Sequence, residues 1–119
     1  MKIAITSTGE TLDSDIDPRF GRAKYFIVWD SETEEFEAVD NAQNLNAAQG
    51  AGVQSAMNVA NKTCDMVVSG HMGPKAFSTL KGAGIKIVSG VEGKVSDVIN
   101  LFKEGKLKDT DSPDVQGHW

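Results

Sequence analysis

The chain has 119 residues, the size of one ordinary domain, and its 39% hydrophobic and 24% charged residues are typical of a globular protein, not a disordered one. Its one cysteine, Cys64, excludes an internal disulfide and a self-sufficient cysteine-ligated zinc or iron–sulfur site. The net charge of −5 is concentrated in residues 1–40, with ten acidic and four basic side chains, which disfavours nonspecific binding of nucleic acid.

The first forty residues predict three strands and one long loop. Residues 2–6 and 23–30 are rich in β-branched and aromatic side chains, and residues 35–40 alternate as a strand with one wet face does. Residues 31–34 predict a turn, so the second and third strands form a hairpin. Residues 7–21 exceed the usual length of a connection, which raises the expectation that this loop is functional.

Helices and strands alternate in the rest of the chain. Three segments carry apolar residues at helical spacing: residues 50–61, 74–81 and 94–103. Two apolar runs between them predict buried strands: residues 64–69 and 85–88. The polar residues 106–119 predict a flexible tail that follows one domain spanning residues 1–105.

No segment of the sequence predicts targeting or membrane insertion. The apolar run at the start is too short for a signal peptide. No stretch approaches the roughly 20 apolar residues that span a bilayer. We therefore expect a cytoplasmic protein without a membrane partner.

The order of the elements, three strands followed by helix, strand, helix, strand and helix, predicts an α/β fold. The simplest layered arrangement is a five-stranded mixed sheet of order 3-2-1-4-5 with strand 2 antiparallel. The apolar fourth and fifth strands suit a sheet that helices cover on both faces.

This arrangement predicts where a ligand binds. In open α/β sheets, ligands bind outside the carboxyl ends of the strands where the strand order reverses, here between the first and fourth strands. Three helices would aim free N–H groups and positive dipole ends at this edge, which suits an anion. The loops bring these residues to it: Arg19, Asn41, Asn44, Gly50, Gly52, Gly70, His71 and Gly73.

Three segments carry a resemblance to a known family: Asp-Pro-Arg-Phe-Gly-Arg-Ala-Lys-Tyr-Phe (17–26), Asn-Ala-Ala-Gln-Gly-Ala-Gly (46–52) and Gly-His-Met-Gly-Pro-Lys-Ala-Phe-Ser-Thr-Leu-Lys-Gly-Ala-Gly-Ile (70–85). They resemble the dinitrogenase iron–molybdenum cofactor-binding family, which comprises nitrogenase accessory factors and small stand-alone relatives. The resemblance covers about residues 1–105 and implies a three-layer α/β/α fold with a ribonuclease H-like motif. It also implies a non-catalytic protein that binds or carries the iron–molybdenum cofactor, an iron–sulfur cluster precursor or a related anionic metal cluster.

One position departs from the cofactor-carrying members of that family. Those members often have His where this chain has Arg19. A guanidinium stays protonated and does not ligate a metal, but its fork of donors pairs with an anionic cluster or an organic acid. This position therefore predicts anion contact and not direct ligation. The expected partners are the cluster and cluster-assembly proteins, and the expected state is a monomer or a weak homodimer.

The predicted cofactor-binding residues are Arg19, Asn44, Gly50, Gly52, Gly70, His71 and Gly73, and the predicted metal ligands are His71 and His118. Several of them have a structural alternative. Arg19 could pair with a nearby aspartate, and Gly70 and Gly73 could allow a close approach to a neighbouring strand instead of a ligand. Cys64 is interpreted as a small buried hydrophobic residue at the far end of its strand.

Two other functions remain open from the sequence. Asp13, Asp15 and Asp17 alternate as oxygen ligands of a hard cation can, although the EF-hand pattern fails, and a solvated acidic loop is the alternative. A ribonuclease H-like hydrolase would need clustered carboxylates, one of them on the first strand, and residues 2–6 have none. A regulatory or interaction module of unknown ligand is the other alternative.

Overall fold

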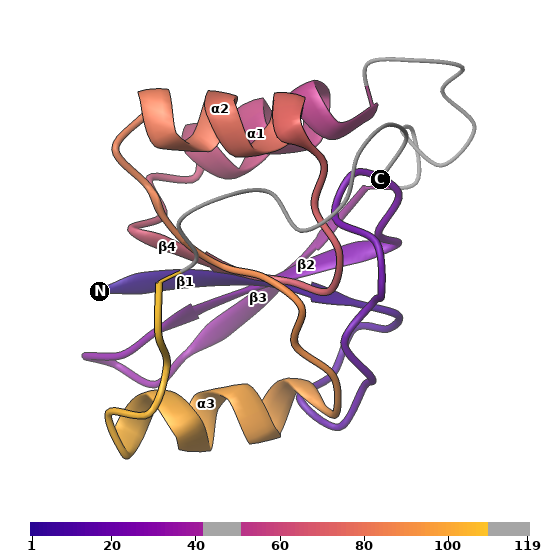
Figure 1. Cartoon of the computed structure of the whole chain (residues 1–119). Coiled ribbons are helices and arrows are strands. Elements are labelled where there is room, and N and C mark those ends of the chain that lie inside the picture. The colour runs from indigo at the N-terminus through magenta and orange to yellow at the C-terminus, as the bar shows by residue number, and fades with distance from the viewer. Residues whose placement is uncertain (42–50, 110–119) are drawn as a thin grey trace.

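The structure, a computed structural model, describes residues 1–41 and 51–109 (Figure 1). Five strands form one sheet: β1 (Lys2–Ser7), β2 (Tyr25–Asp30), β3 (Phe36–Asp40), β4 (Met66–Val68) and β5 (Lys86–Val88). Three helices accompany them: α1 (Ala51–Asn61), α2 (Pro74–Gly82) and α3 (Val95–Lys103).

The strand order is β3-β2-β1-β4-β5. β2 is antiparallel to both β1 and β3, whereas β4 is parallel to β1 and to β5. This is the predicted mixed sheet, so both the order and the direction of strand 2 are confirmed. Helices α1 and α2 cover one face of the sheet and α3 covers the other, which gives three layers (Figure 1).

Alternation along the strands divides the core in two. Ala4, Phe26 and Val67 face α1 and α2, whereas their strand neighbours face α3. Trp29 lies in this second cluster, where its ring centroid is 5.7 Å from that of Phe102 in an edge-on arrangement. Both faces of the central strands β1 and β4 are buried. This agrees with their sequences, because continuous apolar runs are typical of strands that are covered on both faces.

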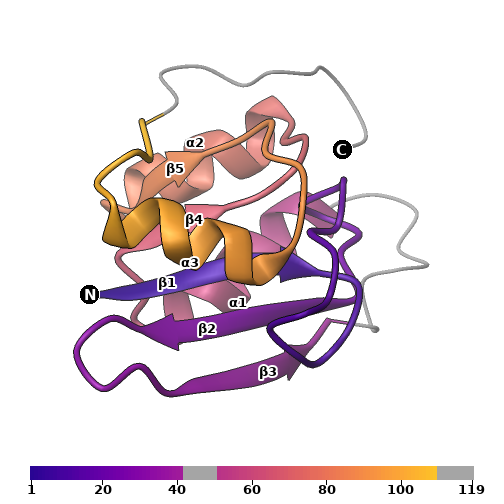
Figure 2. The ribbon, with the colours of Figure 1, turned by 90° about the horizontal axis from the view of Figure 1, so that it is seen from below.

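β3 differs from the predicted strand with one wet face. Every residue of β3 is exposed except Val39, which is half-buried against α1 and α2. Phe36, on the face that α3 covers elsewhere, is 42% exposed. The reason is position: Figure 2 shows α3 over β1 and β4, with β3 clear of the helix at the edge of the sheet. Neither face of this edge strand is fully covered.

No helix in the ranges 1–41 and 51–109 is long and apolar enough to cross a membrane.

Candidate functional site

The predicted crevice between β1 and β4 is filled by the chain itself. After Ser7 the chain turns and comes back, and Ile16 forms an antiparallel bridge with Ser7. The N–H of Asp17 then donates to the carbonyl of Thr6 at 3.1 Å. The carbonyl of Lys2 points toward β4, because it accepts the N–H of Asp65. With a period of two, the carbonyl of Thr6 points the same way, so the returning segment lies on the β4 side of β1.

The same segment then pairs with the residues that follow β4. The N–H of His71 donates to the carbonyl of Pro18 at 2.7 Å, and the N–H of Phe20 donates to the carbonyl of His71 at 3.0 Å. These two bonds make Arg19 and His71 partners in a parallel bridge. Paired residues present their side chains to the same face, so the structure brings these two predicted site residues together.

Gly70 makes this close pairing possible. A Cβ at position 70 would lie 2.5 Å from the carbonyl oxygen of Pro18 and 2.6 Å from its Cα, closer than real Cβ atoms come to backbone. Of the two interpretations of this glycine, the structure therefore supports a close approach to a neighbouring segment. Phe20 anchors the segment from below: it is fully buried, and its ring centroid lies 5.4 Å from that of Phe26.

The side chain of Arg19 is exposed. The Asp17 carboxylate, its nearest acidic neighbour in the sequence, accepts the backbone N–H of Arg19 at 3.1 Å instead of pairing with the guanidinium. In the described ranges no carboxylate forms an ion pair with Arg19. The described residues therefore show no such aspartate pair for Arg19.

The start of α2 adds positive character beside His71. Its N-cap is Gly73, no side chain among residues 1–41 and 51–109 caps it, and Pro74 occupies the first turn. Uncapped N–H groups at a helix start attract anions, because the helix dipole adds to their partial positive charge. Since α2 begins three residues after His71, this turn belongs to the same edge of the sheet as the Arg19–His71 bridge.

The expectation that α3 also offers free N–H groups is wrong. The N–H of Val95 donates to the carbonyl of Ser14, and the N–H of Ser96 donates to that of Leu12. Asp97 Oδ2 accepts the N–H of Lys94 at 2.9 Å, and the N–H of Asp97 donates to the carbonyl of Lys94 at 3.0 Å. The long loop thus closes over this helix start, as its path at the edge of the sheet in Figure 1 shows. An unsatisfied helix end attracts the chain's own carbonyls as readily as a ligand.

Asn41 was expected at this edge of the sheet. In the structure it is buried and hydrogen-bonded to the backbone near the end of the long loop and to α1. It is fully buried, and its Nδ2 donates to the carbonyl of Ala23 at 2.9 Å and to Ser55 Oγ at 3.1 Å. Ser55 Oγ in turn donates to the carbonyl of Gly21 at 3.0 Å. Asn41 therefore ties the loop to α1 in the described residues.

The remaining predicted site residues do not gather at the Arg19–His71 bridge as far as the structure describes them. Gly52 is in α1, where a Cβ would lie 3.2 Å from the Cβ of Ala76, so it lies at the contact between α1 and α2. Gly73 is buried at the start of α2. Asn44, Gly50 and His118 lie outside the described residues. Their binding roles, and those of the other predicted site residues, stay predictions.

The three alternating aspartates do not share a cation site. Asp15 Oδ1 lies 3.8 Å from Lys94 Nζ, the carbonyl of Asp13 accepts from the same lysine, and the Asp17 carboxylate accepts backbone N–H groups. Within residues 1–41 and 51–109, no three His, Cys, Asp or Glu side chains are grouped to hold a metal ion.

Cys64 lies at the amino end of β4, opposite the candidate site. It is 6% exposed and belongs to the core beneath α1 and α2, as predicted. Burial raises the pKa of its thiol to about 11, and the nearby Asp65 carboxylate adds to this, while Lys2 acts against it. The thiol therefore stays protonated at neutral pH and is a poor metal ligand.

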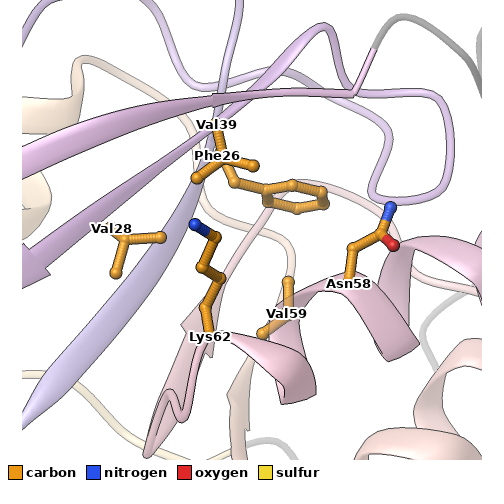
Figure 3. A pocket seen from close by; sticks show the side chains of 6 residues that line it. All are labelled: Phe26, Val28, Val39, Asn58, Val59 and Lys62. Atoms are coloured by element: carbon orange, nitrogen blue, oxygen red, sulfur yellow. The ribbon is translucent and has the colours of Figure 1, made fainter.

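A shallow recess lies elsewhere, between α1 and the strands β2 and β3 (Figure 3). It is lined by Phe26, Val28, Val39, Asn58, Val59 and Lys62. None of these is a predicted site residue, and Lys62 already pairs with Glu37 at 3.2 Å. The recess therefore lies apart from the candidate site and is lined mostly by apolar side chains.

The sequence contains a pattern that could have predicted the role of Asp17 in holding the backbone of this segment. An aspartate two residues before an N–H that it accepts, next to a proline, is an Asx turn, which the Asp-Pro-Arg sequence favours. Nothing in the sequence pointed to Ser55, because its partner Gly21 is 34 residues away in the chain.

The α/β fold with this strand order is one that known proteins share. The chain matches the family described as dinitrogenase iron-molybdenum cofactor over residues 1–105, and it belongs to that family. It is 32% identical over 110 residues to an uncharacterized protein of Methanocaldococcus jannaschii, covering 91% of this chain and 90% of the relative.

Two solved structures are similar over nearly their whole length. The apo form of the orange protein from Desulfovibrio gigas has a TM-score of 0.93 and 37% identity, with 96% of each chain covered. A NifB-like protein from Thermotoga, assigned to the DUF35 family, has a TM-score of 0.83 and 34% identity, with 98% of each chain covered.

Proposed function

We propose that the protein is a non-catalytic carrier of an anionic metal cluster, of the iron–molybdenum cofactor type or an iron–sulfur precursor of it. The observation that carries the proposal is the Arg19–His71 bridge beside the uncapped start of α2, in a chain of this family. The orange protein, solved as an apo form, is by that description a relative with a ligand-bound state.

The chemistry of these groups suits an anion that keeps its own ligands. Arg19 offers a permanent positive charge and several donors, but no ligand atom. The imidazole of His71 can ligate a metal when neutral or donate to an anion when protonated. One ligating side chain with outer contacts holds a cluster reversibly, which a carrier that hands its cargo to a cluster-assembly protein requires. We expect it to act as a monomer or a weak homodimer.

Anaerobic reconstitution tests this proposal. The purified protein is incubated with iron, sulfide and molybdate, desalted, and examined by metal analysis and visible spectroscopy. We expect retained metal and a new visible absorption in the wild type. Arg19→Gln and His71→Gln should each lower retention about ten-fold or more, because a hydrogen bond to a charged group contributes about 1.5–3 kcal/mol.

Lys86→Gln is the matched control for Arg19→Gln. Lys86 is exposed at the amino end of β5, so this variant removes one positive charge away from the candidate site. It should retain metal as the wild type does. A wild type that retains no metal would contradict the carrier proposal and favour an interaction module. Equal losses in all variants would assign the effect to net charge alone.

A further inference from the structure

Asp17 holds both ends of the segment that carries Arg19. Its Oδ1 accepts the N–H of Arg19 at 3.1 Å, and its Oδ2 accepts the N–H of Lys24 at 3.3 Å. Its own backbone is joined to Thr6, whose carbonyl accepts its N–H and whose hydroxyl donates to its carbonyl at 3.0 Å. The residue is 6% exposed. Both oxygens of this buried carboxylate therefore accept backbone N–H groups.

A second anchor holds the far part of the same segment. The carbonyls of Gly21 and Ala23 accept hydrogen bonds from Ser55 and Asn41, both of which are fully buried. Asn58 Nδ2 also donates to Asn41 Oδ1, at 3.4 Å. A buried polar network in which the members are bonded restrains the backbone that it contacts.

We propose that Asp17, supported by Asn41 and Ser55, is a positioning residue that keeps Arg19 beside His71 before any ligand arrives. It thereby strengthens anion binding without touching the anion, because the segment needs no ordering at the moment of binding. The inference rests on the proposed function for its ligand, but its geometry rests on hydrogen bonds within the protein that involve no ligand.

The proposal predicts an effect opposite in sign to simple electrostatics. Asp17→Asn removes a negative charge near an anion site, and this alone would tighten anion binding. The same change replaces one carboxylate oxygen with an NH₂ group, which cannot accept a backbone N–H. One of the bonds to Arg19 and Lys24 is then lost. We expect weaker binding in spite of the more favourable charge.

The test is an NMR titration with molybdate as the anionic probe, combined with amide hydrogen exchange of the probe-free protein. Asp17→Asn should bind the probe about ten-fold more weakly, as is typical when a residue supporting a binding group is removed. It should also speed exchange of the Phe20 and His71 amides, which bond across the two segments.

Asp15→Asn is the control for charge. It makes the same charge change in the same loop, but Asp15 is exposed, and its carboxylate lies 3.8 Å from Lys94 Nζ. We expect equal or slightly tighter probe binding and unchanged exchange. Ser55→Ala, which keeps Asp17 intact, serves if Asp17→Asn fails to fold, and it should weaken binding by a few fold.

The outcomes separate the two proposals. Probe binding by Asp17→Asn as tight as in the wild type, or unchanged exchange at Phe20 and His71, overturns the positioning role. If the wild type binds no molybdate, the anion site itself is contradicted, and the exchange measurement alone then decides whether Asp17 holds the two segments together.

Discussion

Cys64 and His71 lie at opposite ends of β4, and their surroundings give them opposite uses. Cys64 lies before the first residue of β4 in the core, and burial raises the pKa of its thiol to about 11. His71 comes three residues after the last residue of the strand and is half-buried at the edge where Arg19 is exposed. A single cysteine is therefore consistent with a carrier of this kind, because the thiol is not part of the candidate site.

The shifted thiol makes stability depend on alkaline pH. The folded thiol has a pKa of about 11 and the unfolded thiol one near 9.0, so the unfolded chain loses its proton first. Stability from this group is constant below pH 9 and falls as the pH rises from 9 toward 11. Urea unfolding between pH 8 and 10.5 should show this fall in the wild type and a shallower one in Cys64→Ala. Parallel curves for the two proteins would contradict the shift.

Among the elements, the long loop of residues 7–21 determines which groups are exposed at the edge of the sheet. Its first part covers the start of α3, and its second part inserts between β1 and the residues after β4. The loop thereby occupies the N–H groups at the start of α3 and places Arg19 beside His71 in the candidate site. The loop is longer than a connection needs because it has these two places to reach.

Gly70→Ala tests the insertion of this loop. The added Cβ would meet the carbonyl and Cα of Pro18 at 2.5 and 2.6 Å, so the segment must move away from His71. We expect a loss of about 1–3 kcal/mol in the free energy of unfolding, as for overpacked sites. Weaker retention of metal should accompany it.

Gly82→Ala is its control. Gly82 ends α2, and a Cβ there would meet nothing within 4 Å. The variant should be neutral or more stable by up to about 1 kcal/mol, because alanine restricts the unfolded chain. Equal destabilisation by both changes in urea titrations would show that the contact with Pro18 is not the cause.

The whole molecule is held together by two apolar layers, one on each face of the sheet. Leu80 of α2 is fully buried in one of them, whereas Met57 of α1 is 48% exposed. Leu80→Ala should lower the free energy of unfolding by about 2–5 kcal/mol, because it leaves a cavity. Met57→Ala should change it by no more than about 0.5 kcal/mol. Urea denaturation measures both, and a similar cost for the two would contradict this division of the core.

The fold was predictable from local patterns. Apolar runs and helical spacing identified each of the eight elements, and their order along the chain led to the sheet order and to strand 2 antiparallel. The boundaries differ by one or two residues, where hydrogen bonds fray at element ends. The exposure of β3 was not predictable, because it depends on how far α3 reaches across the sheet.

Composition and periodicity by themselves determined the class of fold and the buried place of Cys64, because burial patterns repeat along the chain with the period of each element. The family followed from the resemblance of three sequence segments, and the match over residues 1–105 confirmed it. Only the tertiary structure decided the candidate site. It showed that residues 16–20 fill the crevice, that the start of α3 is occupied and that Arg19 lies beside His71. These contacts join residues far apart in sequence, and they follow from backbone hydrogen bonds, to which side-chain identity gives little guide.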